Sequence, residues 1–500
     1  MKYLYGLSIQ KIQSFIFETA KLKEIIGASQ LVEDICTERF KQFVGMSYKP
    51  ENSIITAAGK IYYIFEERTD CERVVLYYIR ELLCEIPGLK VVQAVVEFDG
   101  NLQQEDINLL ERRLDIQKNK PMAAHGLGLM VSERSRRTGG AGIKTEKGNL
   151  NRLDRKQTAK LNAEEQNPSG LLRLLLEEGE QYNAYDNRNI ENLLSGREKS
   201  WIAVVHADGN NLGKTIRSLT DKIEGEQLPG ALRNFSANLD KATKAAAKKA
   251  FEEVIRPTLK KEGEEKGKQH IPIRPIILGG DDLTVIVRGD LALGFTEVYL
   301  RYFEQFTRQY LMELSLIYGL EATLKNGLTA CAGIAYIKAS YPLHYGINLA
   351  ESLCKHAKKI MKADNALRSC LSFHRVMSSF SEEYNTIVEG ELKVKENFYL
   401  DFGPYFLERQ PAFGYESIQQ LRDWAAAINK ENAPKAPIRN WLTELKINED
   451  NAWQLMNRIK KLNGKFVDSL GLEQAIVVRG ENSEKHSSTH LFDVITISNI

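Results

Sequence analysis

The chain has 500 residues, of which 43% are hydrophobic and 27% are charged, and its formal net charge is +2. This composition is that of a soluble globular protein, and the small net charge excludes a general nucleic-acid-binding or membrane-binding surface. The chain is too long for one ordinary hydrophobic core, so we expect two to four domains.

In chain order, the first elements alternate between strands and helices. Residues 3–9 predict a strand, and residues 11–43 have a largely helical pattern. Residues 53–66 predict two short strands about Ala58-Gly59. A helix at 71–83, a strand at 90–98 and a polar helix follow.

The same order of elements returns in the second part of the chain. Residues 201–207 predict a strand, and apolar residues three and four positions apart predict the long helix that follows. Strands at 273–278 and 283–287 flank the sequence Gly279-Gly280-Asp281-Asp282 as a hairpin. The unit closes with a helix at 291–318, a strand at 328–337 and a helix at 348–361.

Both units have the order βααββαβ of a ferredoxin-like palm, so we predict an α+β fold with an internal duplication. The predicted domains are a first palm at 1–125, an insert at 126–195, a second palm at 196–380 and a mostly helical C-terminal domain at 381–500. In that last domain the pattern is helical at 418–428, 438–445 and 451–462, and residues 490–500 form a β-like run.

The insert is basic and rich in glycine between residues 132 and 160, with Arg134, Arg136, Arg137, Lys144 and Lys147. We expect a loop or small inserted unit here. It is either a solvated connector or a surface that contacts phosphate, and the residue pattern favours the connector.

The cysteines and the start of the chain predict where the protein resides. The six cysteines are scattered without a C-x-x-C pair, which argues against a thiolate zinc site and fits a reducing cytosol. The first residues lack the long apolar run of a signal peptide, and no stretch is a candidate membrane span. We expect a cytoplasmic protein without a membrane partner.

The turn Gly279-Gly280-Asp281-Asp282 is the strongest chemical signal in the sequence. Glycine and aspartate suit a plain hairpin turn, but two adjacent acids between apolar strands repel each other. They become useful when a divalent cation neutralises them. The turn alone favours a metal site and a plain turn about equally.

Asp208 follows the first strand of the second unit, in the sequence His206-Ala207-Asp208-Gly209-Asn210-Asn211. In a palm this strand lies beside the central hairpin, so Asp208 is expected to face Asp281 and Asp282. Three such carboxylates hold two Mg²⁺ or Mn²⁺ ions in nucleotide-polymerising sites. His206 is more simply interpreted as a packing residue.

The same segment continues to Gly213-Lys214-Thr215 and resembles a phosphate-binding P-loop. It is one residue short of that motif, and Asp208 stands in place of the first glycine. We therefore interpret it as part of the metal site, with Lys214 available to a phosphate.

Four motifs in this order resemble the palm of the Cas10/Cmr2/Csm1 family, the large subunits of type III CRISPR complexes related to GGDEF diguanylate cyclases. They are the Asp-Gly-Asn-Asn-Leu-Gly-Lys segment, the Gly-Gly-Asp-Asp hairpin, Ala332-Gly333-Ile334-Ala335 and Ala357-Lys358. The opening Ser8-Ile9-Gln10-Lys11-Ile12-Gln13-Ser14-Phe15 is similar to that family's first palm.

The resemblance implies a site and an activity. It implies that Asp208, Asp281 and the carbonyl of Gly209 bind metal, that Asp282 joins or orients them, and that Lys358 contacts triphosphate. It also implies ATP as substrate and cyclic oligoadenylate as product. The residues expected to bind nucleotide are Gly209, Asn210, Asn211, Lys214, Gly279, Gly280 and Lys358.

The sequence also departs from that family. The first palm has Lys60 where a metal-binding acid is expected, so we predict that this palm is catalytically degenerate. A lysine there could hold a phosphate, but a structural role is favoured. None of the eight histidines is followed by Asp, so the nuclease motif of many relatives is missing, as are the inter-palm zinc thiols.

The sequence therefore predicts a nucleotidyltransferase that uses two Mg²⁺ or Mn²⁺ ions and ATP or another nucleoside triphosphate to make a cyclic nucleotide signal for antiviral defence. One alternative is adenylyl transfer to another small acceptor. A second is a non-catalytic scaffold that binds guide RNA and other subunits of a CRISPR-type complex. A stand-alone enzyme, as a homo-oligomer, is at least as plausible as a CRISPR subunit.

Overall fold

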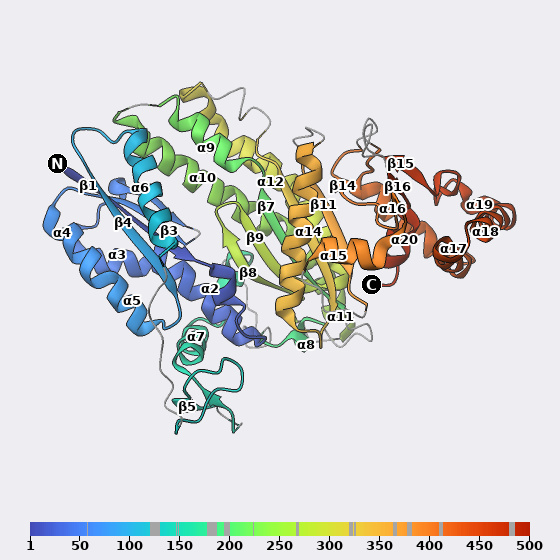
Figure 1. Cartoon of the computed structure of the whole chain (residues 1–500), viewed down its shortest axis with the longest axis horizontal. Coiled ribbons are helices and arrows are strands. Elements are labelled where there is room, and N and C mark those ends of the chain that lie inside the picture. The colour runs from blue at the N-terminus through green and yellow to red at the C-terminus, as the bar shows by residue number, and fades with distance from the viewer. Residues whose placement is uncertain are drawn as a thin grey trace.

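The computed structural model describes residues 1–57, 59–120, 131–146, 148, 150–177, 188–194, 201–223, 225–266, 270–319, 324, 327–363, 368–377, 383–409, 414–479 and 486–500. Ala58 and Lys147, named in the sequence predictions, lie outside these residues. The first palm, the second palm and the C-terminal region follow one another from left to right in Figure 1.

The first palm is built on a four-stranded antiparallel sheet with the order β2-β3-β1-β4. Its strands are β1 (Lys2–Gln10), β2 (Ser53–Ala57), β3 (Lys60–Phe65) and β4 (Lys90–Phe98). Its helices are α1 (Ile12–Ile16), α2 (Leu22–Cys36), α3 (Glu38–Val44), α4 (Arg68–Arg73), α5 (Ile79–Glu85) and α6 (Gln104–Lys118). This strand order confirms the predicted ferredoxin-like unit.

The second palm repeats this order in β8-β9-β7-β10 and extends it by two strands, β11 and β14. Its strands are β7 (Trp201–Gly209), β8 (Ile273–Gly279), β9 (Asp282–Arg288), β10 (Ala330–Lys338), β11 (Cys370–Arg375) and β14 (Tyr405–Phe406). Its helices are α9 (Leu212–Thr220), α10 (Gln227–Ala250), α11 (Arg256–Lys266), α12 (Gly289–Ile317) and α14 (Leu343–Ala363). The predicted duplication of element order is thus present in both sheets.

The two palms pack directly on each other, and their buried apolar residues belong to one continuous core. Arg233 of α10 donates from Nε to the carbonyl oxygen of Ser53, at the start of β2, over 2.7 Å. The hydroxyl of Ser29 on α2 donates to the carbonyl oxygen of Ile276 on β8. These contacts hold the first palm against helix α10 and against the hairpin that carries the two acids.

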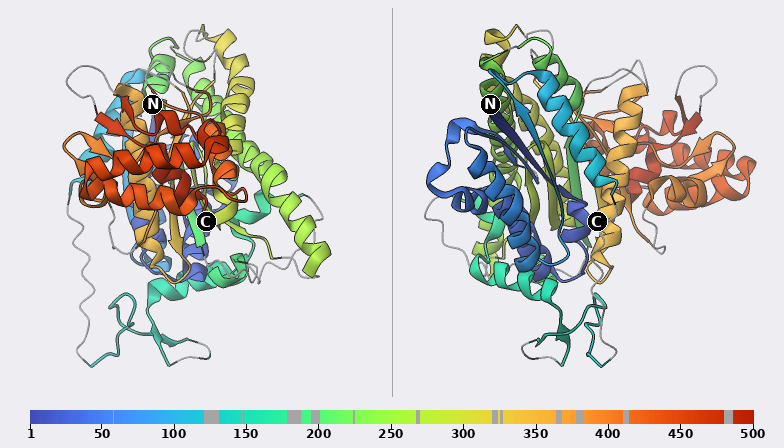
Figure 2. Two further views of the ribbon diagram at one scale, coloured as in Figure 1. Left: turned by 90° about the vertical axis from the view of Figure 1, so that its right-hand side faces the viewer. Right: turned by 60° about the vertical axis from the view of Figure 1, so that its left-hand side comes forward.

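The insert projects below the two palms in both views of Figure 2. It contains β5 (Lys144–Thr145), β6 (Arg152–Leu153) and α7 (Arg155–Gln166), with α8 (Ile190–Leu193) further along the chain. Of the loop or small inserted unit expected at 132–160, the structure has a small unit, in which α7 begins at Arg155. Asp154 and Gln157 form a capping box there, a signal already present in the sequence.

The C-terminal region contains α15 (Tyr384–Ile387), α16 (Ile418–Ile428), α17 (Lys435–Ile447), α18 (Glu449–Leu462), α19 (Gly464–Val467) and α20 (His490–Ile497). It also holds a small sheet of β12 (Lys393–Lys395), β13 (Phe398–Tyr399), β16 (His486–Ser488) and β15 (Val477–Arg479).

The predicted β-run at 490–500 was wrong, because α20 occupies most of it. The Thr489 side chain caps this helix by accepting a hydrogen bond from the Leu491 N–H. Burial of most of its side chains then outweighs the β-propensity of its isoleucine, valine and threonine residues. Among the described residues, no helix is long and apolar enough to cross a membrane.

Candidate active site

The Gly279–Asp282 hairpin has a two-residue turn. Gly279 and Asp282 are paired across β8 and β9, so Gly280 and Asp281 form the tip. Gly280 has φ +61°, and Asp281 does not have a positive φ. This is the pattern of a type II′ turn, which takes glycine at its first central position. The turn therefore needs Gly280 for a conformational reason.

The structure brings the three predicted acids together. Strand β7 lies beside β9, with Ala207 opposite Leu283, so Asp208 emerges next to the turn. One carboxylate oxygen from each of Asp208, Asp281 and Asp282 lies within 4.8 Å of the other two. Among the described residues, no other group of three or more acids, histidines or cysteines converges in this way.

Burial and mutual repulsion act on these carboxyl groups. Burial, and next the charge of Asp208, raise the pKa of Asp281 to about 6. The pKa of Asp282 is also raised well above its usual value, first by burial and then by the charges of Asp281 and Asp208. Because the folded state favours their protonated forms, both ionised acids destabilise the metal-free fold at neutral pH, and this cost disappears as the pH falls.

The donors and the backbone fit a hard divalent cation. All three side chains supply carboxylate oxygens, which Mg²⁺ and Mn²⁺ prefer. Gly209 lies so close to the turn that a Cβ at this position would be 2.9 Å from Cβ of Asp281 and 3.0 Å from its Oδ2. Glycine is thus required at 209 for the acids of two strands to meet.

Lys358 of α14 lies at the edge of this trio. Its Nζ forms an ion pair with Asp208 and donates to the carbonyl oxygen of Gly209 over 2.8 Å. Burial lowers the pKa of this ammonium group, but the charge of Asp208 outweighs that effect, so the pKa is raised. The sequence predicted a triphosphate contact for Lys358, and the structure brings it to two of the predicted metal ligands.

The close packing of α14 on the sheet explains this position of Lys358. A Cβ at Gly333 of β10 would lie 2.0 Å from the carbonyl oxygen of Ala350 on α14. Gly333 therefore allows the helix backbone to approach the strand. This gives a physical reason for the glycine in the Ala332-Gly333-Ile334-Ala335 motif, which the sequence analysis identified only by its resemblance.

The remaining residues of the Asp208–Lys214 segment have different surroundings. Asn210 is buried, and its side-chain amide donates to the hydroxyl of Thr329 over 2.9 Å. Asn211 has φ +57° and precedes α9, and Lys214 is exposed on the first turn of that helix. Only Asn210 and Asn211 separate β7 from α9, too short a connection for a P-loop.

His206 and Lys60 do not belong to the group of three acids. His206 is buried, its Nδ1 lies 3.0 Å from the Thr284 hydroxyl, and burial lowers its pKa to about 4. Lys60 is exposed at the start of β3, opposite Ser8 of β1. The position of His206 agrees with the packing role that the sequence favoured.

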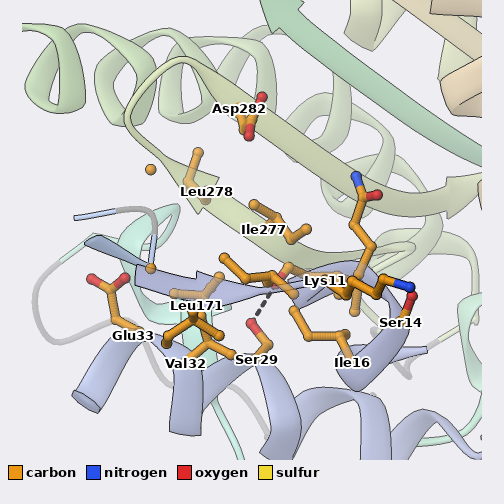
Figure 3. Close-up of a pocket in the computed structure, with 16 residues that line it drawn as sticks. Lys11, Ser14, Ile16, Ser29, Val32, Glu33, Leu171, Ile277, Leu278 and Asp282 are labelled. Atoms are coloured by element: carbon orange, nitrogen blue, oxygen red, sulfur yellow. Dashed lines mark hydrogen bonds between the residues drawn. The ribbon is translucent and has the colours of Figure 1, made fainter. Parts of the chain in front are cut away.

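A cavity of about 500 Å³ lies between the palms and reaches Asp282. Figure 3 shows Asp282, Leu278 and Ile277 on the hairpin side and Ile16, Ser29 and Val32 on the side of the first palm. Its lining is mainly aliphatic, with Lys11, Gln13, Ser14 and Glu33 as the polar and charged side chains besides Ser29 and Asp282.

Sequence reasoning gave no role to Lys11, Ser14 or Glu33. The motif containing Lys11 and Ser14 was noticed only for its resemblance, and Glu33 stands on a helix without a local signal. Burial raises the pKa of Glu33. These side chains line the same cavity as Asp282 only because the two palms pack on each other.

Residues 201–367 match the family model of the Cas10/Cmr2 second palm domain. A search of curated proteins finds no match to the chain. The crystal structure of a Csm1–Csm4 cassette in complex with pppApApA has a TM-score of 0.56 and 13% identity, covering 100% of this chain and 69% of that chain.

Two further structures show the same fold. The Csm1–Csm4 cassette in complex with cA4 has a TM-score of 0.53 and 13% identity, covering 100% of this chain and 70% of that chain. The crystal structure of Csm1 in T. onnurineus has a TM-score of 0.51 and 13% identity, covering 100% of this chain and 69% of that chain. Residues 201–367 therefore correspond to the second palm domain of the Cas10/Cmr2 family, and the whole chain shares its fold with these Csm1 structures.

Proposed function

We propose that the chain is a nucleotidyltransferase that joins ATP molecules into a cyclic oligonucleotide at the Gly279–Asp282 turn. The observation that carries this proposal is the convergence of Asp208, Asp281 and Asp282 within 4.8 Å beside a cavity shared by two palms. The family match of the second palm supports it, as do the complexes of the similar Csm1–Csm4 structures with pppApApA and cA4.

Asp208, Asp281, Asp282 and the Gly209 carbonyl would hold two Mg²⁺ or Mn²⁺ ions. When bound, such ions lower the pKa of the attacking ribose hydroxyl and neutralise charge on the triphosphate. In the reaction, the ribose oxygen of one nucleotide forms a bond to the α-phosphorus of another. The bond from that phosphorus to pyrophosphate breaks, and the hydroxyl proton passes to solvent.

The side chains around the acids have complementary roles in this proposal. Lys358 holds Asp208 in place and offers a positive charge to the triphosphate. Lys214, and the backbone at Gly209, Gly279, Gly280, Asn210 and Asn211, line the approach of the same nucleotide. The cavity between the palms would take the second nucleotide. The aliphatic walls of the cavity would contact the base, and Lys11 would lie near the phosphates.

The same proposal assigns the two palms different work. The second palm carries the acids. The first palm contributes a wall of the cavity, and it has Lys60 where a metal-binding acid would be expected. We propose a cytoplasmic enzyme in antiviral defence, with the domain limits predicted from the sequence. Type III CRISPR subunits with guide RNA, or further copies of this chain, are the proposed partners.

Incubation of the pure chain with each nucleoside triphosphate and Mg²⁺ or Mn²⁺, followed by mass spectrometry of the products, tests this proposal. We expect a cyclic product from ATP together with pyrophosphate. Because the pKa of Asp281 is raised to about 6 in the metal-free protein, Mn²⁺ affinity should fall as the pH is lowered through that value. A linear conjugate would favour adenylyl transfer, and RNA co-purification without any product would favour the scaffold.

A further inference from the structure

Gly280 stands at the tip of the hairpin, where the strand ladder does not pair its backbone groups. The ladder closes at Gly279 and Asp282, so the N–H and C=O of Gly280 need partners from elsewhere. Both partners come from helix α10. The Gly280 N–H donates to Oδ1 of Asp240 over 3.2 Å, and the Gly280 carbonyl accepts from the Thr243 hydroxyl over 2.6 Å.

The spacing of Asp240 and Thr243 suits this double contact. Residues three apart lie on the same side of a helix, so both side chains reach the same residue of the turn. Lys244 donates to Oδ2 of Asp240 over 2.7 Å and leaves Oδ1 directed at the turn. A Cβ at Gly279 would lie 3.3 Å from that Oδ1, a tight contact that favours glycine at the first position of the motif as well.

Thr243 differs from Thr296, another buried helical threonine of the second palm. The hydroxyl of Thr296 on α12 donates to the carbonyl oxygen of Ala292, four residues earlier in its own helix. A buried helical threonine commonly makes that bond. The Thr243 hydroxyl, on a fully buried residue, instead bonds outside its helix to the turn.

The turn needs such support because its two acids, together with Asp208, repel one another. A free glycine at the tip would let the hairpin turn its carboxylates apart. Two hydrogen bonds to one residue hold both of its peptide planes and oppose this movement. Second contacts of this kind orient metal-binding groups and improve metal affinity.

We propose that Asp240 and Thr243 are positioning residues, which hold Gly280 so that Asp281 and Asp282 face Asp208 in the geometry that binds a divalent cation. This inference rests on the proposed metal-dependent function and assigns it two residues on α10. Neither residue touches the nucleotide or the ion in this account. They act through the backbone of the turn.

The test compares Thr243→Val, Thr243→Ser and Asp240→Ala with the unchanged chain. Thr243→Val keeps the shape of the side chain and removes the hydroxyl, and Thr243→Ser restores it. Thr296→Val is the matched control, because it removes a buried hydroxyl that bonds only within its own helix. Mn²⁺ affinity is measured by electron paramagnetic resonance. Hydrogen exchange is measured on the whole metal-free protein and followed by mass spectrometry in the peptide that contains the turn.

We expect Thr243→Val and Asp240→Ala each to weaken Mn²⁺ binding about three- to tenfold, the effect of losing one hydrogen bond. Both should speed hydrogen exchange at the turn, while Thr243→Ser and Thr296→Val keep nearly the original affinity. Asp240 is only partly buried, so its variant serves if Thr243→Val does not fold.

Two results would overturn the inference. One is unchanged Mn²⁺ affinity and unchanged exchange in folded Thr243→Val and Asp240→Ala. The other is an equal loss of affinity in Thr296→Val, which would show a general packing effect. If the unchanged chain does not bind Mn²⁺, the proposed function fails by itself. Hydrogen exchange then still decides whether α10 holds the turn.

Discussion

Replacing Asp281 and Asp282 together by alanine should abolish product formation, with turnover reduced at least about a thousandfold. The two side chains supply most of the carboxylate oxygens at the site, and Asp208 alone cannot hold two cations. The reduction follows because cation-assisted charge stabilisation contributes several kcal/mol to such reactions. Turnover is measured as pyrophosphate release from ATP.

The same variant should fold. Its two acids are unfavourably ionised in the metal-free protein, as their raised pKa values indicate, so their removal should not lower the melting temperature. Glu449→Ala with Asp450→Ala is the matched control, because it removes two adjacent exposed acids at the start of α18. Normal turnover in the Asp281/Asp282 variant would refute the metal site.

Replacing Ile277 by tryptophan should reduce turnover about a hundredfold while Mn²⁺ affinity stays the same. Ile277 lines the cavity of about 500 Å³ between the palms, opposite the first palm's side chains. An indole there takes space that the second nucleotide would need. Displacement of a substrate by about 1 Å costs on the order of a hundredfold in rate.

The control for this variant is Leu76→Trp, on the outer surface of the first palm, where the side chain is 62% exposed. It adds the same group away from the cavity and should leave turnover unchanged. Full activity of Ile277→Trp would show that the cavity does not hold the second nucleotide. Loss of Mn²⁺ binding in that variant would instead show that the hairpin itself was displaced.

Much of the fold could be predicted from the sequence because its signals are local. The alternation of strands and amphipathic helices predicted both palms. The strand that ends near Asp208 and the hairpin that carries Asp281 and Asp282 predicted that the three acids meet. These elements have strong periodicity, and their order allows few sheet topologies. The error at 490–500 arose where tertiary burial overrode β-propensity.

The parts of the site that the sequence did not predict depend on contacts between segments that are distant in the chain. Thr243 and Asp240 lie on a helix whose apolar face was recognised, but nothing local shows that they meet Gly280. The ion pair of Lys358 with Asp208 depends on how closely α14 approaches β10. Glu33 and Lys11 line the same cavity as Asp282 only through the packing of one palm on the other, which no pattern within a palm encodes.

A crystal structure of the chain with Mn²⁺ and a non-hydrolysable ATP analogue tests the central claim most directly. We expect anomalous scattering from Mn²⁺ between the carboxylates of Asp208, Asp281 and Asp282, with the triphosphate of one nucleotide beside it. A second nucleotide should occupy the cavity between the palms. Nucleotide bound elsewhere, with no Mn²⁺ at the three acids, would contradict the account.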